Sequence, residues 1–94
     1  MDKLEKLEMM DKILREFDDL KNSQTSVLKK ISKIEADNIN LGVSLLEKKL
    51  PDMWSNVDSN LALVTSLEEE FQELRDKFYT DNNIKALQDE ANKA

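Results

Sequence analysis

The residues of this chain that could do chemistry are mainly carboxylates, because it contains no histidine and no cysteine. Their absence removes the usual general base, the usual nucleophile pairings and most transition-metal sites. The densest acidic run is Glu68-Glu69-Glu70, and Glu73 follows one helical turn after Glu69. Glu69 and Glu73 could hold a divalent cation, but a solvated helix face paired with lysines is the favoured interpretation. We therefore expect no catalytic residue, no metal, no cofactor and no small-molecule substrate.

The composition indicates long helices. The chain has 94 residues, of which 36% are charged, and it has only one glycine and one proline. Such values are typical of amphipathic helices or coiled coils, and the length allows one small domain. The net charge of −6 argues against nucleic-acid binding. The longest apolar run, Leu61 to Val64, is too short to span a membrane.

The stretch Lys49-Leu50-Pro51-Asp52-Met53-Trp54 contains the only proline and the only tryptophan. Proline ends a helix that reaches it and is suited to open the next one. This predicts an all-α fold, an antiparallel, coiled-coil-like two-helix hairpin forming a single domain over residues 1–94. Its expected parts are helix 1 at about 2–49, a bend at about 50–53, helix 2 at about 52–79, and a tail at 80–94 that can hold a short helix.

Heptad spacing predicts the seam of this hairpin. The helix 1 columns are Gln24, Ile31, Asn38, Leu45 and Val27, Ile34, Leu41; the helix 2 stripe runs through Trp54, Val57, Leu61, Val64, Leu67, Phe71, Leu74 and Phe78. A bend at Pro51 places Ile31 opposite Phe71. It also places Lys29, Lys30 and Lys33 opposite Glu69, Glu70 and Glu73. The weak helix formers of residues 22–26 leave open a break in helix 1.

A second apolar stripe predicts a partner surface. A helix that is apolar on opposite sides needs a second neighbour, and Met53 and Trp54 adjoin the stripe at the expected bend. The predicted partner-binding residues are Ile39, Val43, Leu46, Leu50, Met53 and Trp54. Their expected partner is a protein with an apolar helical face, in a hetero-complex or a homodimer. On this interpretation Leu45→Glu unfolds the hairpin, whereas Leu46→Glu prevents only association.

The outline of the chain resembles the Trp-x-Gly helical hairpin proteins of the type VII secretion pathway. It also resembles the small helical adaptor proteins that accompany LXG-domain toxins in Gram-positive bacteria. At the family's motif this chain has Trp54-Ser55-Asn56, without the glycine. The family's export signal, Tyr-x-x-x-Asp/Glu, falls on Tyr79 to Asn83, where Asn83 replaces the acid.

The resemblance implies an adaptor that binds the helical targeting domain of a secreted toxin. The alternative is a coiled-coil structural subunit of a eukaryotic assembly of the kinetochore-ring or lysosome-biogenesis type. Neither reading makes the chain an enzyme. Because the sequence starts without an apolar segment, we expect a cytoplasmic protein, or one exported without an ordinary signal peptide.

Overall fold

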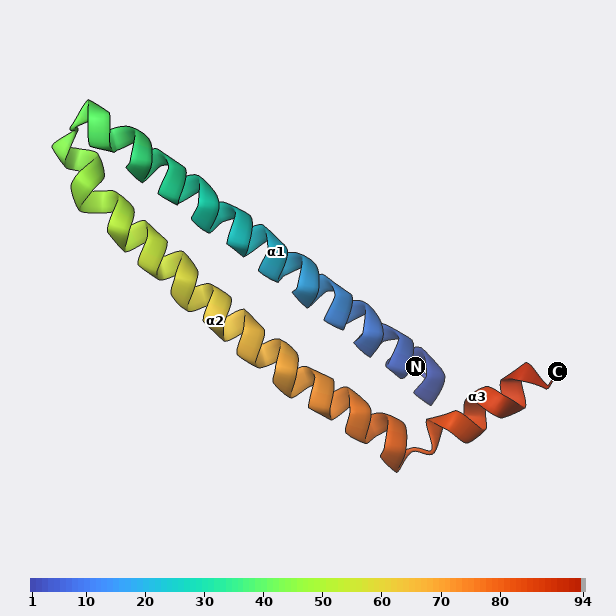
Figure 1. Cartoon of the computed structure of the whole chain (residues 1–94). Coiled ribbons are helices and arrows are strands. Elements are labelled where there is room, and N and C mark those ends of the chain that lie inside the picture. The colour runs from blue at the N-terminus through green and yellow to red at the C-terminus, as the bar shows by residue number, and fades with distance from the viewer. Residues whose placement is uncertain (94) are drawn as a thin grey trace.

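The computed structural model describes residues 1–93, which form a long helical hairpin followed by a short third helix (Figure 1). Helix α1 spans Lys3–Leu41, α2 spans Ser44–Asp81 and α3 spans Ile84–Asn92. The hairpin is elongated, with extents of 67 × 21 × 17 Å. The predicted all-α hairpin with a short C-terminal helix is therefore confirmed.

Helix α1 is continuous. Its N-terminus is capped by Asp2, whose carboxylate accepts a hydrogen bond from the backbone N–H of Glu5 at 2.8 Å. This bond lowers the pKa of Asp2. The weak helix formers of residues 22–26 do not interrupt the helix, and the Thr25 hydroxyl donates to the Lys21 carbonyl at 2.9 Å.

The two long helices are joined at Gly42 and Val43, so the predicted bend at 50–53 is wrong. Gly42 adopts a left-handed conformation, with φ 70° and ψ 32°, which glycine reaches without a steric penalty. The buried Asn38 amide holds the turn by donating to the Val43 carbonyl at 3.1 Å and accepting from the Val43 N–H at 2.9 Å.

Pro51 lies inside α2, eight residues into the helix, instead of ending a helix. A proline there removes one backbone hydrogen bond, but packing can compensate for that loss. Leu50 is only 5% exposed and Leu46 is half-buried, so this first part of α2 is held against α1. Proline was therefore a weaker signal for the turn than the only glycine.

Both long helices contribute two heptad columns to the seam, which we label a and d in the usual coiled-coil convention. On α1, the a residues are Leu7, Leu14, Lys21, Leu28 and Glu35, and the d residues are Met10, Phe17, Gln24, Ile31 and Asn38. On α2, the a residues are Trp54, Leu61, Glu68 and Arg75, and the d residues are Leu50, Val57, Val64, Phe71 and Phe78. The column Gln24, Ile31, Asn38 was predicted correctly. The predicted column Val27, Ile34, Leu41 is exposed, as are Leu45, Leu67 and Leu74.

The pairing register differs from the predicted one by about two heptads. Phe71 packs edge-on against Phe17, with ring centroids 6.0 Å apart. Ile31 lies fourteen residues further along α1, or about 21 Å at ~1.5 Å per residue. The predicted contact of Ile31 with Phe71 is therefore wrong, and so is the pairing of Lys29, Lys30 and Lys33 with Glu69, Glu70 and Glu73.

Helix α3 closes the open end of the hairpin. The chain turns at Asn83, which has a left-handed backbone with φ 49° and ψ 47°. Ile84 follows with no exposed surface, and Leu7 of α1 is also buried. Residues of both helices, including Leu4 and Ala91, line one hollow between α1 and α3.

The position of the turn makes opposite predictions for Pro51→Ala and Gly42→Ala. Pro51→Ala restores a donor inside α2 and is expected to stabilise the hairpin, by up to about 3 kcal/mol. Gly42→Ala is expected to destabilise it by about 1 kcal/mol through left-handed backbone strain. A methyl group there meets nothing within 4 Å, so no clash contributes. Urea unfolding measures both effects; destabilisation by Pro51→Ala would contradict this account of the turn.

Alanine substitutions at Leu50 and Leu45 form a matched pair that tests which leucine belongs to the core. Leu50→Ala is expected to cost roughly 3 kcal/mol because Leu50 is buried. Leu45→Ala should change the free energy of unfolding by less than about 0.5 kcal/mol, since Leu45 is 62% exposed. Equal losses for the two variants in thermal or urea unfolding would show that the seam is assigned incorrectly.

Candidate interaction face

The predicted partner surface does not form one stripe, because the turn divides it. Ile39 is on α1 and 81% exposed, Val43 is in the turn, and Leu46 and Leu50 are on α2. Leu50 belongs to the core and is not free to contact a partner, whereas Leu46 is half-buried. The predicted contrast between Leu45 and Leu46 is also reversed, since Leu45 is the exposed one.

Met53 and Trp54 are exposed, but they lie within α2 and not in the bend. Trp54 lines a surface hollow together with Ser32 and Glu35 of α1. The tryptophan that suggested the type VII secretion resemblance is therefore three helical turns away from the turn of this hairpin. It is positioned to cover the seam between the two helices.

Charged residues occupy part of the seam and bind one another across it. The ammonium group of Lys21 donates to Glu68 Oε1 at 3.0 Å, and this hydrogen bond raises the pKa of Lys21. The guanidinium of Arg75 donates to both oxygens of Asp11, at 2.8 and 3.4 Å, which raises the pKa of Arg75. The same guanidinium lies 5.3 Å from the centre of the Tyr79 ring.

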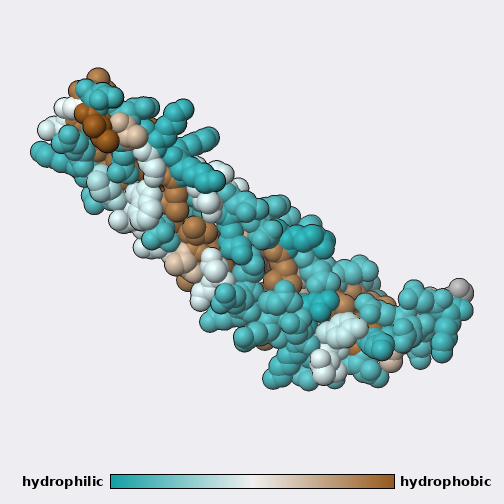
Figure 2. Space-filling model, viewed as in Figure 1, coloured by the Kyte–Doolittle hydropathy of each residue, from teal (hydrophilic) through white to brown (hydrophobic). Residues whose placement is uncertain are grey.

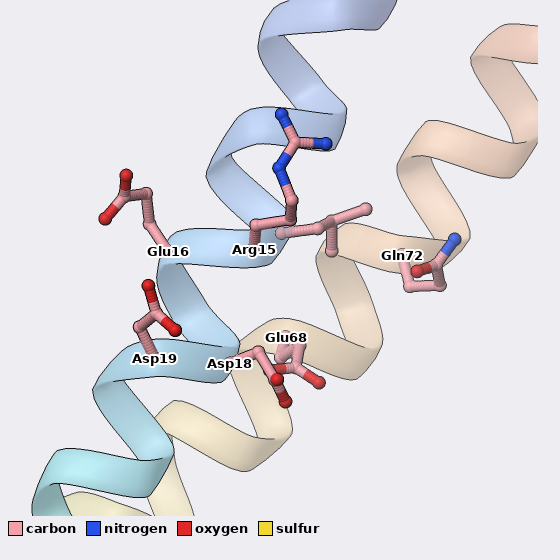
Figure 3. Close-up of a pocket in the computed structure, with 7 residues that line it drawn as sticks. Arg15, Glu16, Asp18, Asp19, Glu68 and Gln72 are labelled. Carbon is pink, nitrogen blue, oxygen red and sulfur yellow. The ribbon is translucent and has the colours of Figure 1, made fainter.

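Four carboxylates, those of Glu16, Asp18, Asp19 and Glu68, line a hollow between α1 and α2 (Figure 3). Figure 3 shows Glu16 and Asp19 pointing from α1 away from α2, whereas Asp18 lies beside Glu68. Lys21 also contacts Asp18, at 3.9 Å. Within residues 1–93 no three such side chains are grouped so that they could hold a metal ion. Two of the carboxylates that line the hollow, Asp18 and Glu68, are thus ion-paired with Lys21.

Each long helix has a third heptad column, which is largely apolar and lies outside the seam. These columns occupy heptad position g, which precedes a, over residues 13–41 of α1 and 46–74 of α2; the next g residues toward the open end, Lys6 and Asp81, are charged. We call them together the apolar face: Ile13, Leu20, Val27, Ile34 and Leu41 on α1, and Leu46, Met53, Asn60, Leu67 and Leu74 on α2. Seven of these side chains are between 40% and 69% exposed. Nine of the ten residues are hydrophobic, and Asn60 is the exception.

Both columns lie on the same side of the hairpin. At about 100° per residue, each g residue sits about 60° from a d residue of its own helix. The d residues Phe17 and Phe71 meet across the seam, and the a residues Lys21 and Glu68 also meet. The d residues of α1 thus face the d residues of α2, and the a residues face the a residues. The two g columns therefore lie side by side, next to the d residues.

The opposite side, next to the a residues, is polar. Its e positions are Asp11, Asp18, Thr25, Ser32 and Ile39 on α1, and Pro51, Asp58, Thr65, Gln72 and Tyr79 on α2. Hydropathy can be followed on one side of the molecule in Figure 2, where hydrophilic atoms cover most of both helices. Hydrophobic atoms there form a broken band along the line between the helices. The hairpin is therefore amphipathic across its width.

The sequence contains a signal for this face, which the predicted apolar stripes did not include. The ten positions run in two sets of five at intervals of seven, 13 to 41 and 46 to 74. Five of them, Val27, Ile34, Leu41, Leu67 and Leu74, were instead assigned to the seam. The true seam column, with Lys21 and Glu35, looks less apolar than the exposed column beside it.

The Lys21–Glu68 pair gives a prediction for stability. Glu68 Oε2 is buried without a hydrogen-bond partner, so Lys21→Met leaves a poorly compensated carboxylate and should lower the Tm. The double variant Lys21→Met/Glu68→Leu should recover the wild-type Tm or exceed it. Since the pKa of Lys21 is raised, its contribution is present below its ordinary value of 10.5 and is lost as the pH rises through the raised value.

Thermal unfolding followed by circular dichroism at neutral pH, and again above pH 10.5, checks both parts. The double variant is the control, because it has no lysine at this position to titrate. An unchanged Tm for Lys21→Met at neutral pH would contradict a role for the pair in stability.

Comparisons with protein-family models, with curated proteins and with solved structures find no match to this chain. Among residues 1–93, no helix has both the length and the apolar character needed to cross a lipid bilayer. The candidate site of this protein is therefore defined by its own geometry, and the apolar face is its most distinctive feature.

Proposed function

We propose that this protein is a protein–protein interaction module whose apolar face binds α-helices. The observation that carries the proposal is the exposure of seven large hydrophobic residues in heptad register on one side of the hairpin. Exposed hydrophobic residues are common when scattered, but a contiguous patch of them marks an interaction site.

The face has the pattern that helix packing requires. Its residues recur every seven positions on two antiparallel helices, which is the spacing of a coiled-coil seam. A further helix laid along it would extend the hairpin into a bundle. Fully burying one aliphatic side chain is worth roughly 1.5–3 kcal/mol before the costs of association. Because these side chains are half-exposed, each contributes a part of that free energy, and several together are enough to offset the costs of association.

The ionisable groups at the seam support a binding role over a catalytic one. Lys21, Glu68, Asp11 and Arg75 are paired with one another across the helices. Such pairs fix how α1 and α2 sit against each other and so keep the apolar face in register.

The finer predictions from the sequence use the same face. An adaptor in type VII secretion would bind the helical domain of a toxin there, and a coiled-coil subunit of a eukaryotic assembly would bind its neighbours there. Both remain predictions, as do the cytoplasmic location and export without an ordinary signal peptide. Ile39, Val43, Met53 and Trp54 are the exposed members of the partner surface predicted earlier, and of these four only Met53 belongs to the apolar face.

The test is affinity capture from the native organism with paired variants. Ile34→Glu/Leu67→Glu places two charges on the apolar face, where burying them against a partner would be costly. We expect this variant to lose the proteins that the wild type retains. Ser26→Glu/Ser59→Glu is the matched control, because both serines are exposed on the outer sides of the helices. If the wild type and both double variants capture the same partner proteins, the proposal is refuted.

A further inference from the structure

We infer that the occupant of the apolar face is a second copy of this chain, bound face to face in an antiparallel four-helix bundle. This inference rests on the proposed function and names its partner. In this dimer α1 packs on the partner's α1 and α2 on the partner's α2. The two-fold axis lies at the level of Val27 and Asn60.

The first reason is that the face is nearly symmetric about its own middle. Val27 is the third of five positions on α1, and Asn60 is the third of five on α2. The other eight positions are all leucine, isoleucine or methionine. A two-fold dimer uses the same patch on both copies, so it requires a patch that maps onto itself. A rotation about the middle pairs Leu20 with Ile34 and Met53 with Leu67 of the other copy.

The second reason is the single polar residue. Asn60 sits where the proposed axis passes, so its amide would meet the same amide of the other copy. A carboxamide can donate and accept at once, which lets two symmetric asparagines satisfy each other. One buried asparagine in an apolar seam is a known device for fixing register and orientation. Any shifted pairing would instead bury Asn60 against a hydrophobic side chain.

The third reason is area. From Ile13 to Leu41 the face is about 42 Å long at ~1.5 Å per residue, and the molecule measures 21 Å along its second-longest axis. The product is roughly 880 Å², close to the ~800 Å² per partner of a stable protein–protein interface. A second hairpin has the same width and can cover both columns of the face over their full length.

The fourth reason is charge. The charged residues at the positions that flank the apolar face are Glu16, Lys30, Asp37, Lys49, Glu70 and Lys77. Three acids against three bases leave no net charge there, compared with −6 for the whole chain. Most of the negative charge therefore lies on other sides of the hairpin. Two copies can approach through this face with little like-charge repulsion.

The mass of the purified full chain tests the inference. Sedimentation equilibrium over a range of concentrations should give twice the 10.9 kDa of one chain for the wild type. Ile34→Glu/Leu67→Glu should be monomeric with unchanged helical circular dichroism, and Ser26→Glu/Ser59→Glu should remain dimeric. A monomer at every concentration, or a dimer that survives Ile34→Glu/Leu67→Glu, overturns the inference.

Cysteine cross-linking tests the orientation, because the chain has no cysteine of its own. Asn60→Cys alone should form a disulfide-linked dimer under mild oxidation, since the two copies of this position meet at the axis. Cross-linking of Asn60→Cys with Val27→Cys, without self-linking of Asn60→Cys, would indicate the parallel arrangement and overturn the proposal. If the chain is monomeric but capture still depends on the apolar face, only the dimer fails. If capture is also independent of the face, the proposed function fails with it.

Discussion

The two hydrogen bonds between the Asn38 amide and Val43 are the contacts on which the rest of this hairpin depends. Together with the left-handed Gly42, they decide where α1 ends and α2 begins. Because a hairpin has one turn, the position of that turn fixes which residue of α2 lies opposite each residue of α1 along the seam. It brings Phe17 to Phe71 and Lys21 to Glu68, and it places the α1 and α2 columns of the apolar face side by side. An asparagine inside the seam thus acts as a register residue through the turn.

The register explains why charged residues lie in the seam while hydrophobic residues are exposed, which is unusual for a small helical protein. Lys21, Glu35, Glu68 and Arg75 are partly shielded in the seam, while hydrophobic residues in the neighbouring heptad columns remain exposed. A monomer alone would gain by burying the hydrophobic column and exposing the charged one. The arrangement makes sense if both columns are buried in an assembly, where ion pairs fix the hairpin and apolar residues join it to a partner. Conformational specificity gained at some cost in stability is a recognised use of polar seam residues.

Composition and periodicity were enough to predict an all-α hairpin with a short terminal helix and the burial of Ile31 and Asn38. They did not predict the turn, because Pro51 was given more weight than Gly42. A proline can be carried inside a helix when packing at Leu50 holds both sides, whereas a left-handed residue ends a helix directly. The error in the turn also divided the predicted stripe, since Ile39, Val43, Leu46 and Leu50 were expected on one helix. The apolar face could have been found from its two sets of five positions at intervals of seven.

The most direct test of this account is a pair of distances between spin labels on the chain, diluted with unlabelled protein. One pair joins Ser23 to Ser66, and the other joins Ser23 to Thr80, all exposed positions. With the turn at Gly42, Ser23 lies level with Ser66, and Thr80 is displaced along the hairpin by about 21 Å at ~1.5 Å per residue. Double electron–electron resonance should therefore give the shorter distance for Ser23 and Ser66. A shorter distance for Ser23 and Thr80 would place the turn near Pro51 and contradict both the register and the apolar face.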